Sequence, residues 1–313
     1  MKRKAVKLAI LSWLLLPALL LPDSLHASLS EPVDPCPSEA IYLFTQHYAF
    51  HAADSLIRQH ESRLKHDPEF ELAVINYYWT RKIAGNTSAN WVQKLNNAID
   101  SFKEHHVSAD FAESDEHLFL MTSVLAFGAR VHLHNNAYFA ALNDLKKYNT
   151  VLRKTFGREK TFPPFYLTSG LYYYFSAYAT EKLPFVTVFS GDKTLEDMKT
   201  GIAYLKIAAG ADNRMISTEA RYFLMKIFFE LQKNPQEAAR YCQMLISEFP
   251  DNLLYRYYMV CINLALNQEK RAAGLIVQLS ELAQGNNNLS AAEMEHFIKL
   301  AADEMKKVKK KKP

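Results

Sequence analysis

Apolar residues recur every three to four positions from Ser38 almost to the end of the 313-residue chain. This spacing predicts amphipathic helices, because one face of an α-helix repeats every three to four residues. No stretch sustains the two-residue alternation of a half-buried strand, so the pattern predicts an all-α fold without a sheet. Proline, glycine and asparagine residues divide the first half into predicted helices over residues 38–65, 68–85, 91–105, 114–134 and 137–157.

The strongest pattern is a helical hairpin that occurs twice between residues 218 and 288. At an offset of 35 residues, matching pairs are Tyr222 with Tyr257, Phe223 with Tyr258, Ala238 with Ala273, Cys242 with Val277, and Pro250 with Gly285. A period near 34 residues with an early aromatic residue, a later small residue and a proline near the end is typical of the tetratricopeptide repeat (TPR). Such repeats stack into an α-solenoid of antiparallel helix pairs and usually bind partners.

These patterns predict an organisation in successive segments. A polar loop separates the last repeat from Ser290, where the sequence SAAE matches a capping box that starts a final amphipathic helix. The predicted segments are a signal peptide (1–27), a linker (28–37), N-terminal helical repeats (38–157), an irregular helical middle (158–217), two TPR-like repeats (218–288), a capping helix (289–305) and a Lys-rich tail (306–313).

The N-terminus has the order of a secretory signal peptide. A basic start is followed by the apolar stretch 8–21 and by the small residue Ala27. The apolar stretch is too short to span a bilayer core of about 30 Å comfortably. We therefore expect cleavage near Ala27 and an exported mature protein that does not span the membrane, in the periplasm of a Gram-negative bacterium. An uncleaved anchor is the alternative.

Charge argues against one class of partner. Removal of residues 1–27 takes away four basic residues and one acidic residue, so the net charge falls from +4 to +1. Six of the remaining basic residues are lysines of the tail 306–313, which leaves the body of the protein at −5. A mildly acidic body lacks the clustered basic face of a nucleic-acid-binding protein.

The sequence offers no familiar catalytic motif. It contains neither GxSxG nor GxxxxGK[ST]. His47 and His51 have the i, i+4 spacing of two zinc ligands, but Tyr48 stands where a zinc protease has glutamate. The pairs 105–106 and 132/134 lack same-face helical spacing. We therefore expect no enzyme, no cofactor and no metal site.

The three cysteines leave one alternative open. Cys36 lies in a loop-like segment and is expected to be exposed, whereas Cys242 and Cys261 fall on predicted packed helices. These two residues are either buried free thiols or the partners of one disulfide.

The candidate binding site is the concave face of the two repeats. With Pro250 near the end of its repeat, the first helices present an aromatic-rich face, and aromatic side chains dominate the energetics of many interfaces. The alternative is that another helix of the chain fills this groove and makes the same residues core. The predicted partner-binding residues are Phe223, Ile227, Tyr255, Tyr258 and Ile262.

Three segments also carry a family resemblance: GLYYYFSAY (170–178), LPFVTVFSGDKTLEDMKTGIAYLKIAA (183–209) and TEARYFLMKIFF (218–229). They resemble exported TPR proteins of the Bacteroidetes type. Over residues 165–260 their order is also similar to the inclusion-body-clearance family of TPR proteins. The resemblance implies an α-helical array without a cofactor, and it transfers no catalytic residue.

Two functions follow as hypotheses. The first is a non-catalytic exported TPR scaffold, which binds a protein or peptide segment or a cell-envelope component through its aromatic-rich concave face. The second is a carrier of a small apolar, lipid-like ligand in a pocket enclosed by helices.

Overall fold

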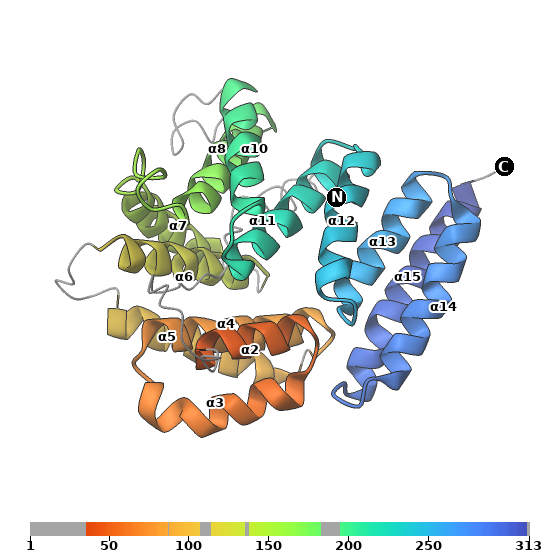
Figure 1. The fold of residues 1–313 in the computed structure, drawn as a ribbon, viewed down its shortest axis with the longest axis horizontal. Helices are drawn as coiled ribbons and strands as arrows, with labels where there is room; N and C mark the ends of the chain where they lie inside the picture. Colours follow the sequence, from red (N-terminus) through yellow and green to blue (C-terminus); the bar gives the residue numbers. More distant parts are fainter. Residues whose placement is uncertain (1–35, 87, 107–113, 135–137, 183–194, 312–313) are drawn as a thin grey trace, which may run out of the picture. The chain divides into compact units, whose positions relative to one another are not determined.

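The computed structural model describes residues 36–86, 88–106, 114–134, 138–182 and 195–311 (Figure 1). Within these ranges the chain forms helices and turns and contains no strand, which confirms the predicted all-α class. None of the helices in these ranges combines the length and the apolar character needed to cross a membrane. The predicted signal peptide and the apolar loop 184–191 lie outside the described residues.

The helices follow one another closely along the chain. They are α2 (Pro37–Gln46), α3 (Phe50–Leu64), α4 (Pro68–Ile83), α5 (Ala89–His106), α6 (Asp115–His134), α7 (Tyr138–Leu152), α8 (Phe165–Lys182), α10 (Leu195–Ala209), α11 (Arg214–Lys226), the π-helical turn η2 (Ile227–Leu231), α12 (Pro235–Glu248), α13 (Leu253–Ala265), α14 (Glu269–Gly285) and α15 (Ala291–Lys311).

The chain folds into two compact units, each built from segments that are distant in sequence. Unit 1 contains His66–Leu72 and Asn96–Ala220, and unit 2 contains residues 36–65, Ala73–Leu95 and residues 221–311. The compact units therefore do not coincide with the successive segments that the sequence patterns predict.

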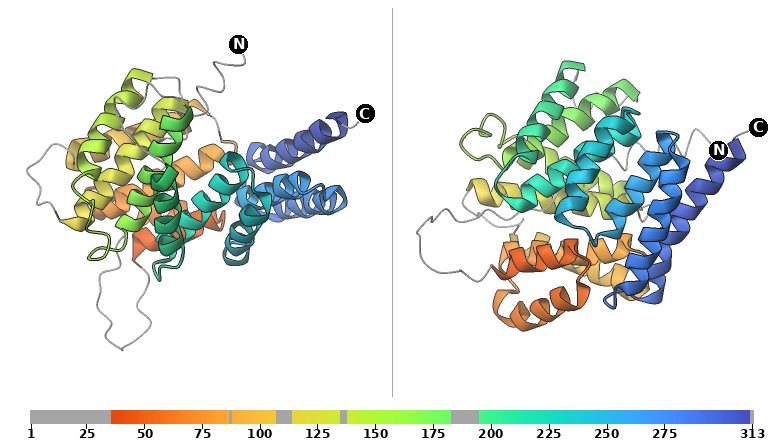
Figure 2. Two further views of the ribbon diagram at one scale, coloured as in Figure 1. Left: turned by 90° about the horizontal axis from the view of Figure 1, so that it is seen from above. Right: turned by 45° about the vertical axis from the view of Figure 1, so that its right-hand side comes forward.

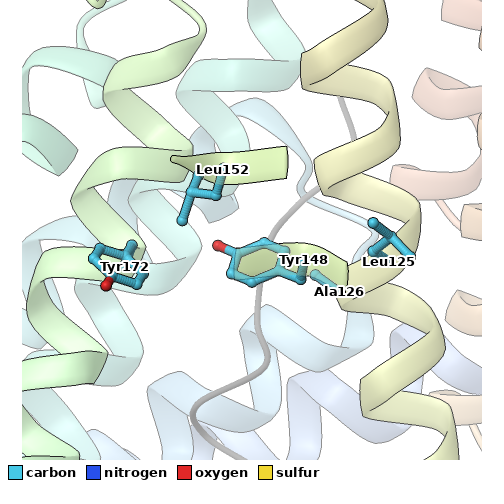
Figure 3. Packing of buried hydrophobic residues seen from close by; sticks show 5 residues of the cluster. All are labelled: Leu125, Ala126, Tyr148, Leu152 and Tyr172. Atoms are coloured by element: carbon cyan, nitrogen blue, oxygen red, sulfur yellow. The ribbon is translucent and has the colours of Figure 1, made fainter. Parts of the chain in front are cut away.

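In unit 1, α6 packs against α7 and α8 packs against α10. A cluster of Leu125, Ala126, Tyr148, Leu152 and Tyr172 fills the space between α6, α7 and α8 (Figure 3). The contact between α8 and α10 depends on glycine: a Cβ atom on Gly201 would lie 2.5 Å from the Tyr174 backbone nitrogen. The two backbones therefore approach each other more closely than any larger residue allows.

In unit 2, a buried ion pair joins α4 to the last helix, α15. Arg81 of α4 donates to both carboxylate oxygens of Glu293 in α15, from Nε at 2.8 Å and from Nη2 at 2.9 Å. The guanidinium group also lies over the rings of Phe50 and Trp91. The Glu293 side chain is fully buried and accepts hydrogen bonds from Ser290 N and Oγ, each at 2.8 Å. The predicted capping box at Ser290 is thus confirmed.

Several predicted helix boundaries differ from the observed ones, and the two largest differences lie at Tyr48 and at the C-terminal helix. The helix predicted over 38–65 is broken at Tyr48, which has a left-handed backbone (φ 57°) and a fully buried ring beside Phe50 and Phe297. Burial of this ring outweighs the local helical periodicity. At the other end, α15 continues to Lys311, so most of the predicted tail is the end of a helix.

The C-terminal half of unit 2 is a row of consecutive helical hairpins. Helix α13 packs against α12, α14 and α15, and α14 packs against α15 (Figure 2). In the first hairpin the turn between the helices contains Lys233 (φ 53°), and in the second it contains Asn267 (φ 59°). These two turn residues are 34 positions apart, not 35.

The turn η2 explains the change of offset. A π-helical turn holds one more residue than an α-helical turn, so it adds one residue to the first hairpin. Before η2 the buried residues match at 35, as in Phe223 with Tyr258. After η2 they match at 34: Ala238 and Ala272 are both fully buried, whereas Ala273 is exposed. The predicted pairing of Ala238 with Ala273 is therefore wrong by one residue.

This corrected register makes a sharp prediction about stability. Replacing the buried Ala272 by leucine should overpack the contact between α14 and its neighbours and cost about 1–3 kcal/mol of unfolding free energy. The matched control is Ala273→Leu on the exposed side of the same helix, which should change the unfolding free energy by less than about 0.5 kcal/mol. Urea denaturation of both variants measures the difference. Equal effects, or a larger effect at Ala273, would contradict the register.

Candidate functional site

The five predicted partner-binding residues all lie in the interior of unit 2. No more than 8% of the surface of any of them is exposed. The list is Phe223 on α11, Ile227 on η2, and Tyr255, Tyr258 and Ile262 on α13. Their positions agree with the alternative in which a helix of the same chain fills the groove. They form part of the core in this structure.

The end of α2 contacts the start of α13. The Tyr255 hydroxyl donates to Gln46 Oε1 at 2.8 Å, and Asn252 Nδ2 donates to the Gln46 backbone carbonyl at 2.8 Å. Asn252 also caps α13, because its Oδ1 accepts from the Tyr255 backbone N–H. All three residues are buried. The N-terminal helix is thus hydrogen-bonded into the face that the sequence predicts for a partner.

A second group of polar contacts satisfies Tyr258. Its hydroxyl donates to Glu230 Oε1 at 3.1 Å, and Lys226 Nζ lies 5.4 Å from its ring centre and 3.5 Å from Glu230. Burial raises the pKa of the Tyr258 phenol well above its usual value, and the nearby Tyr222 and Glu230 add to the increase. The phenol therefore stays protonated and acts as a donor within the protein.

Unit 1 contains a hollow lined by histidines and carboxylates. Its volume is about 650 Å³, and it lies where the start of α4, the end of α5 and the start of α6 meet. The chain has eleven histidines, and four of them line this one hollow, which sets it apart from scattered surface histidines. The lining residues are His66, Asp67, Pro68, Glu69, His105, His106, Ser114, Glu116, His117 and Leu120.

Glu71 is the centre of the polar cluster beside this hollow. His105 Nδ1 lies 3.0 Å from Glu71 Oε1, and His106 Nε2 lies 2.6 Å from Glu71 Oε2. Ser101 Oγ donates to Glu71 Oε1 at 3.2 Å. Glu71 and His106 are buried, whereas His105 is partly exposed. One potential metal-ligating atom from each of Glu71, His105 and His106 lies within 4.8 Å of the others.

Local sequence explains why these side chains meet. Asp67 caps α4 by accepting from the Phe70 N–H at 2.8 Å, which places Glu71 in the first turn. His105 and His106 stand in the last turn of α5. A carboxylate near a helix start and imidazoles near a helix end both favour the local helix dipole. The start of α4 therefore brings an acceptor to the donors at the end of α5.

Two further histidines border the cluster. His66 Nδ1 lies 3.3 Å from His105 Nδ1, with the two rings nearly perpendicular. His117 stands in the first turn of α6. Desolvation lowers the pKa of His117 below its usual value, the positive charge of a protonated His106 lowers it further, and a hydrogen bond to the His106 backbone opposes both effects.

The sequence pattern does not single out this cluster, because the adjacent histidines 105 and 106 lack same-face helical spacing. At the end of a helix, however, adjacent side chains reach one carboxylate from two sides, and that carboxylate comes from the preceding helix. The sequence does contain a usable signal. Acidic residues stand in the first turn of the helix predicted over 68–85, and two histidines stand at the end of the helix predicted over 91–105.

His47 and His51, which have i, i+4 spacing in the sequence, do not lie on one helix. His47 caps the end of α2 and His51 lies in α3, because the helix breaks at Tyr48 between them. His47 Nδ1 lies 3.9 Å from Asp251, and the exposed His51 is not part of a metal-ligating group among the described residues.

All three cysteines are free thiols in the structure. Cys36 is exposed, as predicted. The buried Cys242 donates from Sγ to the Tyr255 carbonyl at 3.3 Å, and burial raises its pKa. Burial likewise raises the pKa of Cys261 to about 12. Both helical cysteines therefore stay protonated and serve as packing residues.

Comparisons with known proteins provide no family assignment: neither the protein-family models nor the curated proteins include a match to this chain.

The hydrogen bond between Tyr255 on α13 and Gln46 on α2 can be tested by a double-mutant cycle. Tyr255→Phe removes the donor to Gln46 Oε1, and Gln46→Ala removes the acceptor. We expect the two losses of unfolding free energy to be non-additive by about 0.5–1.5 kcal/mol, the usual net contribution of one hydrogen bond. Urea denaturation of the two single variants and the double variant measures this coupling. Additive effects would show that Tyr255 and Gln46 do not interact in solution.

Proposed function

We propose that this protein is a non-catalytic helical scaffold of the TPR type that is exported to the periplasm of a Gram-negative bacterium. Its role in this proposal is to bind a protein segment or a component of the cell envelope. The observation that carries the proposal is the internal repeat of unit 2. Two hairpins have matching left-handed turn residues at an offset of 34, the period of a TPR, and their buried positions match at 35 before η2 and at 34 after it.

The repeat supports a binding role for a physical reason. Each hairpin buries its apolar face only against the next one, so a stack of hairpins exposes a long side surface. Here the first hairpin, which ends in α12, the second hairpin α13–α14 and the helix α15 form one stack, and the predicted partner-binding residues on α13 are buried. A partner therefore has to use the outward-facing helices. Met244 on α12 and Val277 on α14 are 42% and 57% exposed, and they are large apolar residues of the second helix of each hairpin.

The alternative of an apolar-ligand carrier gains no support from the hollow in unit 1. Seven of its ten lining residues carry imidazole or carboxylate groups, with Leu120 and Pro68 as apolar members. A lipid-like ligand would leave those polar groups desolvated and without partners, which is unfavourable.

Export is tested by the mass of the native protein. A basic start, an apolar stretch and Ala27 imply that a signal peptidase removes residues 1–27. Intact-mass spectrometry of protein from a periplasmic extract should give the mass of a chain that starts near residue 28. Alanine-to-arginine substitution at position 27 should block processing. A full-length mass for the wild-type protein, held in the inner membrane, would contradict this part of the proposal.

Partner binding is tested by site-specific photocrosslinking in the host cell. A photoreactive amino acid at Met244 or at Val277 should give the same discrete protein or envelope adduct, identified by mass spectrometry. The matched controls are Gln243 and Gln278, the polar exposed neighbours on the same two helices. The proposal predicts strong adducts at the apolar positions and weak ones at the controls. Unrelated adducts at the two apolar positions, or none at either, would count against a scaffold that binds through these helices.

A further inference from the structure

We propose that Glu71, His105 and His106 of unit 1 form a binding site for a divalent transition-metal ion, with Zn²⁺ as the ion that this ligand set favours. This inference is independent of the scaffold proposal, which concerns the helices of unit 2. It also replaces the expectation from sequence that the chain has no metal site.

The donor atoms match the chemistry of zinc. Two imidazole nitrogens and one carboxylate oxygen are a ligand set that zinc proteins use when three side chains hold the ion and the fourth position stays open. Ligands at about 2.0–2.1 Å from a tetrahedral ion lie roughly 3.3 Å from one another. Glu71 Oε1 and His105 Nδ1 are 3.0 Å apart, and the three ligating atoms span no more than 4.8 Å. Small side-chain movements therefore suffice to admit the ion.

The surroundings hold the ligands in place. Ser101 Oγ donates to the Glu71 carboxylate, and the Phe102 ring lies 4.6 Å from the His106 ring, centre to centre. Hydrogen bonds to ligating carboxylates fix their orientation and commonly contribute 10-fold to 100-fold to metal affinity (about 1.4 kcal/mol for each factor of ten). Glu71 and His106 are buried, so water does not compete freely for them.

The open side of the cluster faces the hollow. Both His105 and His106 line it, and His66 Nδ1 lies 3.3 Å from His105 Nδ1 at the same place. A metal ion held by the three ligands thus has its fourth position directed toward the hollow, where His66 or a small ligand is within reach. The carboxylates Asp67, Glu69 and Glu116 also line the hollow and favour a cation there electrostatically.

Hydrogen bonding alone is the competing explanation. Glu71 with two histidines and Ser101 is already a satisfied buried carboxylate, so the same geometry has a purely structural interpretation. The two explanations differ in one measurable property, because only a metal site binds Zn²⁺ with one ion per chain.

The test uses the full mature chain, treated with a chelator and then dialysed. Titration with Zn²⁺ in a calorimeter should give one ion per chain, with a dissociation constant of about 1 μM or lower. Titration with Co²⁺ should give the intense visible bands of a four-coordinate ion. Zn²⁺ should also raise the melting temperature.

The variants are chosen so that misfolding cannot imitate a loss of ligands. His105→Ala removes the partly exposed ligand and should fold, with affinity for Zn²⁺ reduced at least 10-fold. Glu71→Gln keeps the shape of the buried acceptor and should have a similar effect. His51→Ala, an exposed histidine outside the cluster, is the matched control and should leave the affinity unchanged. Circular dichroism without metal verifies that each variant is folded.

Two results would overturn the proposal. One is a wild-type chain that shows no binding of Zn²⁺ up to about 100 μM, far above the range of specific protein sites. The other is binding that His105→Ala and Glu71→Gln do not weaken relative to His51→Ala, which would show that surface histidines capture the ion.

Discussion

The buried ion pair between Arg81 and Glu293 is the constraint on which unit 2 depends. It joins α4 to α15 across 212 residues of sequence, and the same carboxylate also completes the capping box at Ser290. A fully buried carboxylate is tolerated only when each of its lone pairs has a partner, and removing one partner of such a pair costs about 3–5 kcal/mol. Arg81 and Ser290 together meet that demand, so the first helices of the chain must close against the last.

The same unit also buries the aromatic residues of α13. Gln46 at the end of α2 accepts hydrogen bonds from Tyr255 and from Asn252. In an open solenoid the same tyrosine would line a groove. Here it belongs to the core. The position of a residue within a repeat therefore does not by itself decide whether it binds a partner.

The sequence predicted the helical class and the capping box, because each depends on residues that are close together along the chain. It did not predict η2 or the break at Tyr48. The sequence of η2, IFFEL, is compatible with an uninterrupted α-helix. The effect of the extra residue shows only in α14, where Ala272 is buried and Ala273 is exposed. Tyr48 adopts a left-handed backbone because its ring is buried against Phe297, which is almost 250 residues away. Such long-range causes leave no local signal.

The cluster of Glu71, His105 and His106 illustrates a different limit. An acidic residue in a first helical turn and histidines in a last turn are each explained by the helix dipole, so neither is evidence of a ligand site when taken alone. Their meaning changes when the start of one helix lies beside the end of the next, because the same favourable charges then converge on one point. A ligand site can therefore form at the ends of helices, whereas the repeat pattern directs attention to their faces.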